Sequence, residues 1–305
     1  MSSEQLGAAQ NVLKGNLGGA WDINKGYQDA YTDLGVARRF GSVDAAYSLK
    51  DIGAMNGRVV RVRRDTGGAA GDDDEEDFTA NQVISGALES FVGSGNAGYV
   101  VEWYDQSGNG NDATAPSDEK QPPIVESGSL ITFNGNPCIK ASRENSTNNH
   151  KLDIDSHIIE PYTFFGVGRS NRGSKANWFS KSGIEPMMRL HTSNVQADFG
   201  ADAFGSLLVD GDVAEGALYT LFSASNTGNA VMRRNGVQVD DTSGGTNPIS
   251  RTTAANASGV ECLFSMKDND PGEFLFTNLM IFFDGDKTSD FSAIENELMR
   301  EFGLL

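Results

Sequence analysis

The chain has 305 residues, 38% of them hydrophobic, and a formal net charge of −18. That length suits one large domain or two small ones. An acidic surface repels the phosphates of nucleic acids and of anionic membranes, which excludes nucleic-acid-binding and membrane-surface classes. The sequence contains no apolar stretch near the ~20 residues of a membrane span, and its first residues lack the pattern of a secretory signal.

The first 45 residues differ in pattern from the rest of the chain. Apolar side chains recur at helical spacing, which predicts one or two short amphipathic helices. Two interpretations stay open: an arm that docks on another protein, or a helix that caps its own domain. In the first interpretation the anchors are Ile23, Tyr27, Tyr31 and Leu34.

Strand patterns begin near Ala46. Residues 58–64 alternate valine with arginine, which predicts a strand with one polar face. The acidic run at 71–77 predicts a solvated loop, because blocks of like charge are usually solvated. We therefore place a domain boundary between residues 45 and 46, with one domain from 46 to 305.

One internal amphipathic helix is predicted after the acidic run. Thr79 and Gln82 fit a capping box, and a glycine at 93 or 95 ends the helix. Its apolar stripe consists of Val83, Ile84, Ala87, Leu88 and Phe91.

The strand at 98–104 follows this helix. Strict alternation places Tyr99, Val101 and Trp103 on one face. It places Val100, Glu102 and Tyr104 on the other.

Further short strands follow with turn signals between them, and Asn235-Gly236 predicts a tight hairpin. A final helix has Phe291, Ile294, Leu298 and Phe302 at helical spacing. The pattern predicts a mainly β fold, a two-sheet antiparallel jelly-roll sandwich with a few peripheral helices. Its later strands lie at 130–133, 162–168, 177–182, 187–191, 217–225, 230–240, 260–266 and 274–283, the last apolar on both faces.

The loop after the strand at 98–104 is rich in Asp, Gln, Ser, Gly and Asn. Such residues build self-bonded turns, because their side chains accept backbone N–H bonds and glycine permits left-handed dihedral angles. An aromatic ring beside planar amides also suits sugar recognition. The structural interpretation is favoured, and the ligand-binding alternative assigns Trp103, Tyr104, Asp105, Gln106, Asn109 and Asn111.

Catalytic and metal-binding motifs are absent from the sequence. His150, His157 and His191 lack metal-ligand spacing, and no acidic segment completes a calcium loop, so we expect neither metal nor cofactor. A retaining glycosidase needs two carboxylates ~5–5.5 Å apart, and among 42 acidic residues no pair stands out. Cys138 and Cys262 are expected to be buried, reduced thiols.

Several segments together resemble a known family. AYSLKDIG (46–53), RVVRVRRD (58–65), the amphipathic helix and EWYDQSGNGNDAT (102–114) resemble the start of the arabinofuranosidase B-type catalytic domain in order and spacing. The remainder is similar to the concanavalin A-like lectin/glucanase superfamily. The fungal enzymes carry disulfides and an adjacent cysteine pair, whereas the two cysteines of this chain lie far apart in sequence.

Non-enzymatic versions of this pattern are frequent in bacteriophage virion proteins. The resemblance thus implies a virion structural or accessory protein: a head decoration, a collar, or a tail fibre or spike component. Its partners would be other virion proteins and a cell-surface glycan, with copies oligomeric or clustered on the particle. Residues 1–45 would then be the attachment arm. The alternative is an arabinofuranosidase-like glycoside hydrolase, for which no catalytic residue is assigned.

Overall fold

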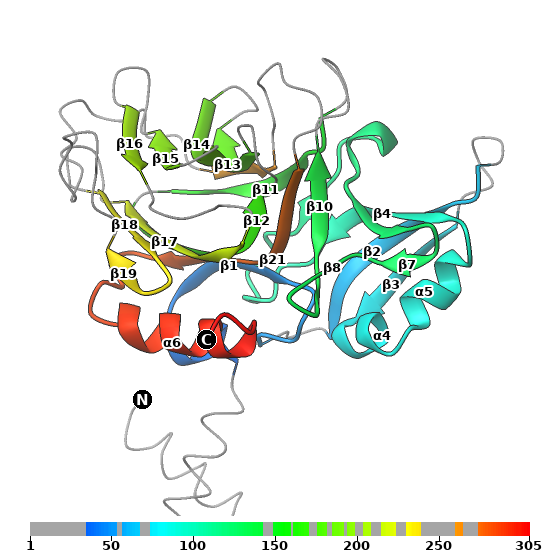
Figure 1. The fold of residues 1–305 in the computed structure, drawn as a ribbon, viewed down its shortest axis with the longest axis horizontal. Coiled ribbons are helices and arrows are strands. Elements are labelled where there is room, and N and C mark those ends of the chain that lie inside the picture. Colours follow the sequence, from blue (N-terminus) through cyan, green and yellow to red (C-terminus); the bar gives the residue numbers. More distant parts are fainter. Residues whose placement is uncertain are drawn as a thin grey trace, which may run out of the picture. The chain divides into compact units, whose positions relative to one another are not determined.

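The computed structural model shows a two-sheet β-sandwich with short helices at its margins (Figure 1). Residues 1–34 lie outside the described part, and so do the predicted anchors Ile23, Tyr27, Tyr31 and Leu34. The structure describes residues 35–53, 57–67, 74–142, 149–159, 161–170, 176–181, 185–191, 194–198, 204–208, 215–223, 230–238, 260–264 and 274–305.

The first sheet has seven strands in the part of the chain described, and the long apolar strand predicted near the C-terminus lies inside it, one position from an edge. All its pairings are antiparallel. In spatial order it contains β1 (Val43–Ser48), β21 (Phe274–Asp284), β12 (Tyr162–Ser170), β17 (Ala217–Ser223), β18 (Ala230–Arg234) and β19 (Val237–Gln238), while β10 (Ile139–Ser142) also pairs with β21.

The second sheet has twelve described strands and is also antiparallel. A short hairpin of β8 (Thr132–Phe133) and β9 (Asn136–Pro137) stands apart from both sheets. The strands of the second sheet are β16 (Phe204–Leu208), β15 (Asn194–Asp198), β14 (Glu185–His191), β13 (Ala176–Lys181), β20 (Val260–Leu263), β11 (Leu152–Ile158), β5 (Ala113–Thr114), β4 (Ala97–Trp103), β2 (Arg58–Asp65) and β3 (Glu75–Thr79), with β6 (Pro123–Glu126) paired to β4 and β7 (Ser129–Leu130) paired to β6.

The main core lies between the sheets and is rich in aromatic rings. Phe164 contacts Trp178, Phe179 and Phe282 with ring centroids 4.8–5.7 Å apart. Trp103 stacks on Phe264 at 6.1 Å. These side chains are fully buried and come from both sheets, which confirms the predicted sandwich.

A second core covers the outer face of the seven-stranded sheet. Helix α6 (Phe291–Glu301) packs there together with the short α3 (Val36–Arg39). The predicted apolar stripe of the last helix is confirmed, because each of its members is buried. β21 is therefore covered on both faces, as its unbroken apolar sequence predicts.

The described domain begins before the predicted boundary at Ala46. Val36 is fully buried in the second core, and Val43 belongs to β1, which pairs with β21. An ion pair between Arg39 and Glu297 joins α3 to α6. Residues from Gly35 onward thus contribute to the sandwich, because their apolar side chains fill its outer layer.

The predicted internal helix is broken in two. Thr79 forms the predicted capping box with Gln82 at the start of α4 (Ala80–Ile84). Gly86 then adopts φ +85°, and α5 (Ala87–Val92) begins after it. The left-handed glycine turns the chain, so Leu88 packs in the core while Ile84 is 62% exposed.

The predicted alternation along β4 is wrong because of a β-bulge. Val60 of β2 pairs with Trp103 of β4, and Val62 of β2 pairs with Val100 of β4. Between these two pairs, β4 therefore contains one residue more than β2. The extra residue places Val100 and Trp103 on the same buried face, although strict alternation puts them on opposite faces.

The acidic run predicted as a loop lies partly in a strand. Residues 71–73 are outside the described part, but Glu75–Asp77 belong to β3 at the edge of the twelve-stranded sheet. Arg61 lies opposite Asp77, and Arg63 lies opposite Glu75. Cross-strand pairs of opposite charge remove the like-charge repulsion on which the loop prediction depended.

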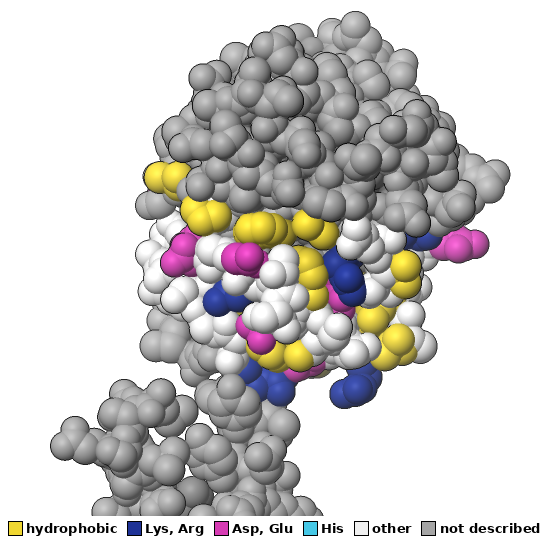
Figure 2. Space-filling model, turned by 90° about the vertical axis from the view of Figure 1, so that its left-hand side faces the viewer, with side chains coloured by type: hydrophobic (Ala, Val, Ile, Leu, Met, Phe, Trp, Pro, Cys, Tyr) yellow, Lys and Arg dark blue, Asp and Glu magenta, His cyan; other side chains and the backbone are white. Residues whose placement is uncertain are grey.

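Both cysteines are free and buried, as predicted. Burial raises the pKa of the Cys138 thiol to about 12. Within the described ranges, no helix is long and apolar enough to span a membrane. On the face shown in Figure 2, acidic and basic side chains are interspersed over the described surface.

Candidate functional site

Asp105 is the centre of the loop that the sequence singles out. Its carboxylate accepts hydrogen bonds from the backbone N–H of Ala46 at 2.8 Å, of Ser107 at 2.9 Å and of Asn111 at 3.1 Å. The Ser107 hydroxyl donates a further bond at 2.6 Å. Asp105 therefore fixes both the shape of the loop and its attachment to β1.

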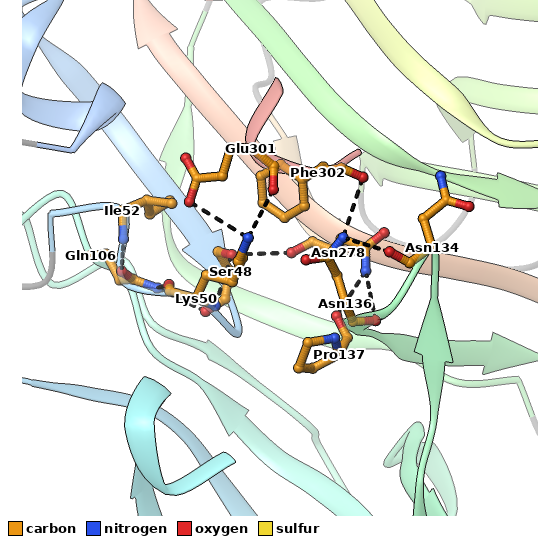
Figure 3. Close-up of polar contacts among 10 residues, drawn as sticks. All are labelled: Ser48, Lys50, Ile52, Gln106, Asn134, Asn136, Pro137, Asn278, Glu301 and Phe302. Atoms are coloured by element: carbon orange, nitrogen blue, oxygen red, sulfur yellow. Dashed lines mark hydrogen bonds and ion pairs between the residues drawn. The ribbon is translucent and has the colours of Figure 1, made fainter. Parts of the chain in front are cut away.

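Gln106 fills the space beneath the loop (Figure 3). Its Nε2 donates to the carbonyls of Ser48 at 2.7 Å and Lys50 at 3.0 Å, and its Oε1 accepts from the N–H of Ile52 at 3.0 Å. The side chain is 1% exposed. All of its hydrogen-bonding atoms thus bind the chain that leaves β1.

The two asparagines of the loop also bind the backbone of β1. Asn111 Nδ2 donates to the Asp44 carbonyl at 2.6 Å, and Asn109 Nδ2 donates to the Val43 carbonyl at 2.5 Å. The Tyr47 hydroxyl donates in turn to the Asn111 carbonyl. These contacts agree with the structural interpretation of the loop, in which Asx side chains serve the fold.

The two aromatic residues before the loop have different positions. Trp103 is fully buried in the main core, where no ligand reaches it without unfolding. Tyr104 lies where β4 ends, and its ring is covered by the guanidinium of Arg58 at 4.4 Å. Tyr104 is only 6% exposed, but of the predicted ligand-binding residues it alone contacts the partly exposed charged side chains Arg58 and Asp77 on the sheet.

We name this group the β2–β4 polar cluster: Arg58, Arg61, Asp77, Glu102 and Tyr104. The Tyr104 hydroxyl donates to Asp77 at 2.7 Å, and Arg58 and Arg61 each donate to Asp77 at 2.8 Å. Arg61 also lies 3.7 Å from Glu102. The side chains face away from the core, because their strand neighbours Val60, Val62 and Trp103 face it.

The carboxylates of the cluster have pKa values displaced in opposite directions. Partial burial acts to raise the pKa of Asp77, but hydrogen bonds from Arg61, Arg58 and Tyr104 outweigh it and lower that pKa. Burial raises the pKa of Glu102, and the nearby Asp112 raises it further, against the effects of Tyr104 and Arg61. One carboxylate is thus held ionised while its neighbour is shifted towards the protonated form.

Asp112 lies beside the cluster at the end of the loop. Burial raises its pKa, and the charge of Asp105 adds to that effect against a backbone hydrogen bond. Its Oδ1 accepts from the N–H of Asp105 at 2.8 Å. Glu102 and Asp112 therefore form a pair of neighbouring acids with raised pKa values.

Four members of the cluster are absent from the predicted site residues, and one of them, Glu102, lies in the predicted strand at 98–104. Arg58, Arg61 and Asp77 belong to segments identified as an alternating strand and an acidic loop. The signal that could have found Arg58 and Arg61 is the mixture of valine and arginine itself, because buried valines in a strand leave the arginines between them on the polar face. Which acidic residues lie opposite that face depends on the register of the strands in the sheet. The local sequence does not determine that register.

A second polar network ties α6 to the sandwich (Figure 3). Lys50 Nζ donates to the Glu301 carbonyl at 2.9 Å and lies 4.9 Å from the ring centre of Phe302. Asn136 Nδ2 donates to the Phe302 carbonyl at 3.2 Å. Burial raises the pKa of Glu301, against the effect of Lys50. This network holds the end of the helix rather than a ligand.

Asn278 closes the seam between two partners of β21. β1 pairs with β21 as far as Leu279, β10 pairs from Thr277, and Asn278 lies between them at a bulge. Its Nδ2 donates to the Pro137 carbonyl at 2.8 Å, and its carbonyl accepts from Ser48 Oγ at 3.2 Å.

The part of the chain that the structure describes contains no group of three His, Cys, Asp or Glu residues able to hold a metal. His150 is buried, and its Nδ1 accepts from the N–H of Ser142 at 2.9 Å. Burial lowers the pKa of His150 to about 4. The side chains of His157 and His191 are outside the described part.

Comparison with known proteins identifies the fold of this chain but no family to which it belongs. No family model matches the chain, and no curated protein matches it. A mutant GH54 α-L-arabinofuranosidase soaked with 4-nitrophenyl α-L-arabinofuranoside matches with a TM-score of 0.55 and 13% identity. An arabinofuranosidase complexed with arabinofuranosyl-α-1,2-xylobiose matches with a TM-score of 0.52 and 12% identity.

Each of these matches covers 84% of this chain and 62% of the other protein. This chain thus spans less than two thirds of the enzymes that it resembles. A botulinum neurotoxin type C structure, described as interacting with two ganglioside molecules, matches with a TM-score of only 0.46. The chain therefore has the β-sandwich fold found in these arabinofuranosidase structures, and the predicted resemblance is confirmed at the level of the fold.

Proposed function

We propose that this chain is a carbohydrate-binding component of a bacteriophage virion, acting as a head decoration, a collar, or part of a tail fibre or spike. The β2–β4 polar cluster is the observation that carries the carbohydrate-binding part of the proposal. It holds charged side chains in fixed geometry beside a tyrosine, on the face of the sheet turned away from the main core.

The chemistry of the cluster suits sugar hydroxyl groups. Carboxylates accept and guanidinium groups donate hydrogen bonds, and mutual ion pairing holds both in place before a ligand arrives. The side chains stay accessible: Arg58 is 43% exposed, Arg61 37%, Asp77 28% and Glu102 19%. Tyr104 is only 6% exposed and supports the cluster from below, because its hydroxyl donates to Asp77 and its ring lies under the Arg58 guanidinium.

The virion part of the proposal rests on the sequence resemblance and on the acidity of the chain. A net charge of −18 keeps closely spaced copies soluble on a particle. Residues 1–34 would be the attachment segment, with Ile23, Tyr27, Tyr31 and Leu34 as anchors, and copies would be oligomeric or clustered. Antibody labelling of intact particles by electron microscopy tests this part. Labelling no greater than background would contradict it.

Glycan binding is tested separately with an array of neutral and acidic glycans. We expect the native chain to bind a set of glycans. Arg61→Gln should weaken that binding about tenfold, because it removes two charged donors from the cluster. Lys151→Gln is the matched control, since Lys151 makes an exposed ion pair with Asp153 on a different strand. Equal losses in both variants would show that the cluster is not the site.

The alternative function is an arabinofuranosidase-like hydrolase, and the neighbouring acids Glu102 and Asp112 favour it. Glycoside hydrolysis needs one carboxyl group with a raised pKa as the acid and a second carboxylate nearby. Release of arabinose from arabinosyl substrates, abolished by both Glu102→Gln and Asp112→Asn, would establish the enzyme. Binding without release would leave the lectin-like function.

A further inference from the structure

A row of cationic and aromatic side chains crosses the outer face of the seven-stranded sheet. Lys140 of β10 lies opposite Phe276 of β21, and Phe276 lies opposite Arg169 of β12. Along β12 the row follows Phe165 and Val167, which α6 covers. The row thus lies on the face of the sheet that α6 covers. Its β12 member, Arg169, comes two residues after Val167, the last residue of β12 buried in the second core.

The guanidinium of Arg169 lies over two aromatic rings. Its centre is 4.4 Å from the ring centre of Phe276 and 5.5 Å from that of Phe133. Phe133 comes from the β8–β9 hairpin and rests on Gly216, where any side chain would collide with the ring. The fold therefore keeps two aromatic rings in contact with one arginine.

Arg169 differs from the paired arginines of the described domain. Arg61, Arg64 and Arg233 each meet a carboxylate. Among the described residues, the Arg169 side chain makes no hydrogen bond and no ion pair, and its Nε is buried without a partner. In a chain with 42 acidic and 24 basic residues, an arginine left without an acid is chemically unsatisfied.

The neighbouring cation is already neutralised. Lys140 lies 4.5 Å from the ring centre of Phe274, but its ammonium pairs with Glu126 at 2.7 Å. The free positive charge of the row, within the described residues, is therefore at Arg169. Phe274 and Phe276 are only partly buried, so aromatic surface borders that charge.

We propose that Arg169 is the anchor of a second binding site, which takes the carboxylate of an acidic sugar. A guanidinium presents a planar fork of donors that matches a carboxylate in a two-point contact, and stacking holds that fork in one orientation. The adjoining aromatic surface suits the ring that carries the carboxylate. The choice of a sugar as the ligand rests on the proposed carbohydrate-binding function. The observation that the guanidinium is unpaired is independent of that proposal.

The test measures binding of methyl β-D-glucuronide and of methyl β-D-glucoside to the full chain by NMR titration. The pair differs only at the carboxylate. We expect the glucuronide to bind about tenfold or more tightly than the glucoside, and Arg169→Gln to remove that preference. The Arg169 Nε–H resonance of the native protein should shift on addition of glucuronide and not of glucoside.

Arg64→Gln is the matched control, because Arg64 also lies over a phenylalanine ring but pairs with Asp74. Thermal melting of both variants distinguishes lost binding from lost folding, and the Nε–H shift needs no variant. An unmoved Nε–H resonance, or unchanged preference in Arg169→Gln, overturns the site. Binding of acetate as tight as that of glucuronide overturns the sugar assignment.

The proposals for the two sites can be refuted independently of each other. If neutral glycans bind through Arg61 but Arg169 shows no carboxylate preference, the proposed function stands and this inference fails. If glucuronide shifts Arg169 while Arg61→Gln changes no glycan affinity, the Arg169 site stands and the cluster is not a site.

Discussion

At the scale of single residues, the loop after β4 shows how side chains replace regular secondary structure. Asp105, Gln106 and Asn111 supply hydrogen bonds that a continuous strand would obtain from its neighbours. The residue types that suggest a ligand site are here those that fasten the loop to β1. A ligand role for them would require these contacts to break first.

Replacing Asp105 with alanine should lower the free energy of unfolding by about 1–3 kcal/mol, because several backbone donors lose their acceptor. Chemical denaturation measures the change. Asp286→Ala is the control, since Asp286 accepts one exposed bond from Thr288 and should cost less than about 0.5 kcal/mol. A variant as stable as the parent that has lost a specific glycan would instead establish a ligand role for Asp105.

His150 should make the protein less stable as the pH falls through the weakly acidic range. Its pKa is about 4 in the folded state and near 6.5 when unfolded. Between these values the unfolded chain binds more protons, so stability rises with pH and is lost as pH decreases. The full effect is on the order of 3 kcal/mol at pH 4.

Melting curves between pH 4 and 7 for the native chain and His150→Asn measure this contribution. Asparagine keeps an acceptor for the N–H of Ser142 but does not titrate. The acids with raised pKa values, such as Glu102, titrate in both proteins and cancel in the difference. Parallel pH profiles for the two proteins would contradict the prediction.

At the scale of elements, the sequence predicts whether a segment is a strand or a helix where its apolar pattern is strong. It does not predict where a strand bulges or a helix breaks. β21 and α6 follow directly from apolar periodicity. The bulge in β4 and the break at Gly86 do not, because both depend on which strands and helices lie opposite. For the same reason the sequence points to Tyr104 but not to Arg61 or Asp77, whose proximity depends on sheet register.

Helix α6 is fastened by a buried ion pair, and that contact should be costly to break. Glu295 is 1% exposed and accepts from Arg233 Nε at 2.8 Å and from Thr220 Oγ1 at 2.8 Å. Glu295→Ala leaves the 19% exposed Arg233 without its carboxylate and Thr220 without its acceptor, for which we expect a loss of about 3 kcal/mol.

Hydrogen exchange and denaturation of Glu295→Ala measure that loss and should locate it at α6. The matched control is Asp153→Asn, which removes an exposed ion pair with Lys151 and should cost at most about 1 kcal/mol. Similar losses in the two variants would show that the buried pair does not hold the helix.

At the scale of the whole molecule, the described domain is a sandwich with an additional helical layer. A chain that begins at Gly35 should fold with a melting temperature close to that of the full protein. One that begins at Ala46 loses Val36 and Val43 from the second core and should be much less stable. Calorimetry of both truncations tests this boundary.

The attachment proposal makes a further distinction between these truncations. The chain from Gly35 should remain folded but fail to join particles, because it lacks the proposed anchors. If that truncation joins particles as the full chain does, residues 1–34 are not the attachment segment. If it aggregates, those residues belong to the domain's own core.

The packing of α3 against α6 has a mechanical consequence. The chain enters the domain at α3 and reaches its last described helix in the same outer layer (Figure 1). A pulling force applied through residue 35 would first peel away α3 and then β1, an edge strand whose hydrogen bonds would open one after another. Such peeling yields at lower load than shearing a whole strand at once. The domain would therefore give way first at α3 and β1, while the twelve-stranded sheet keeps its shape under strain.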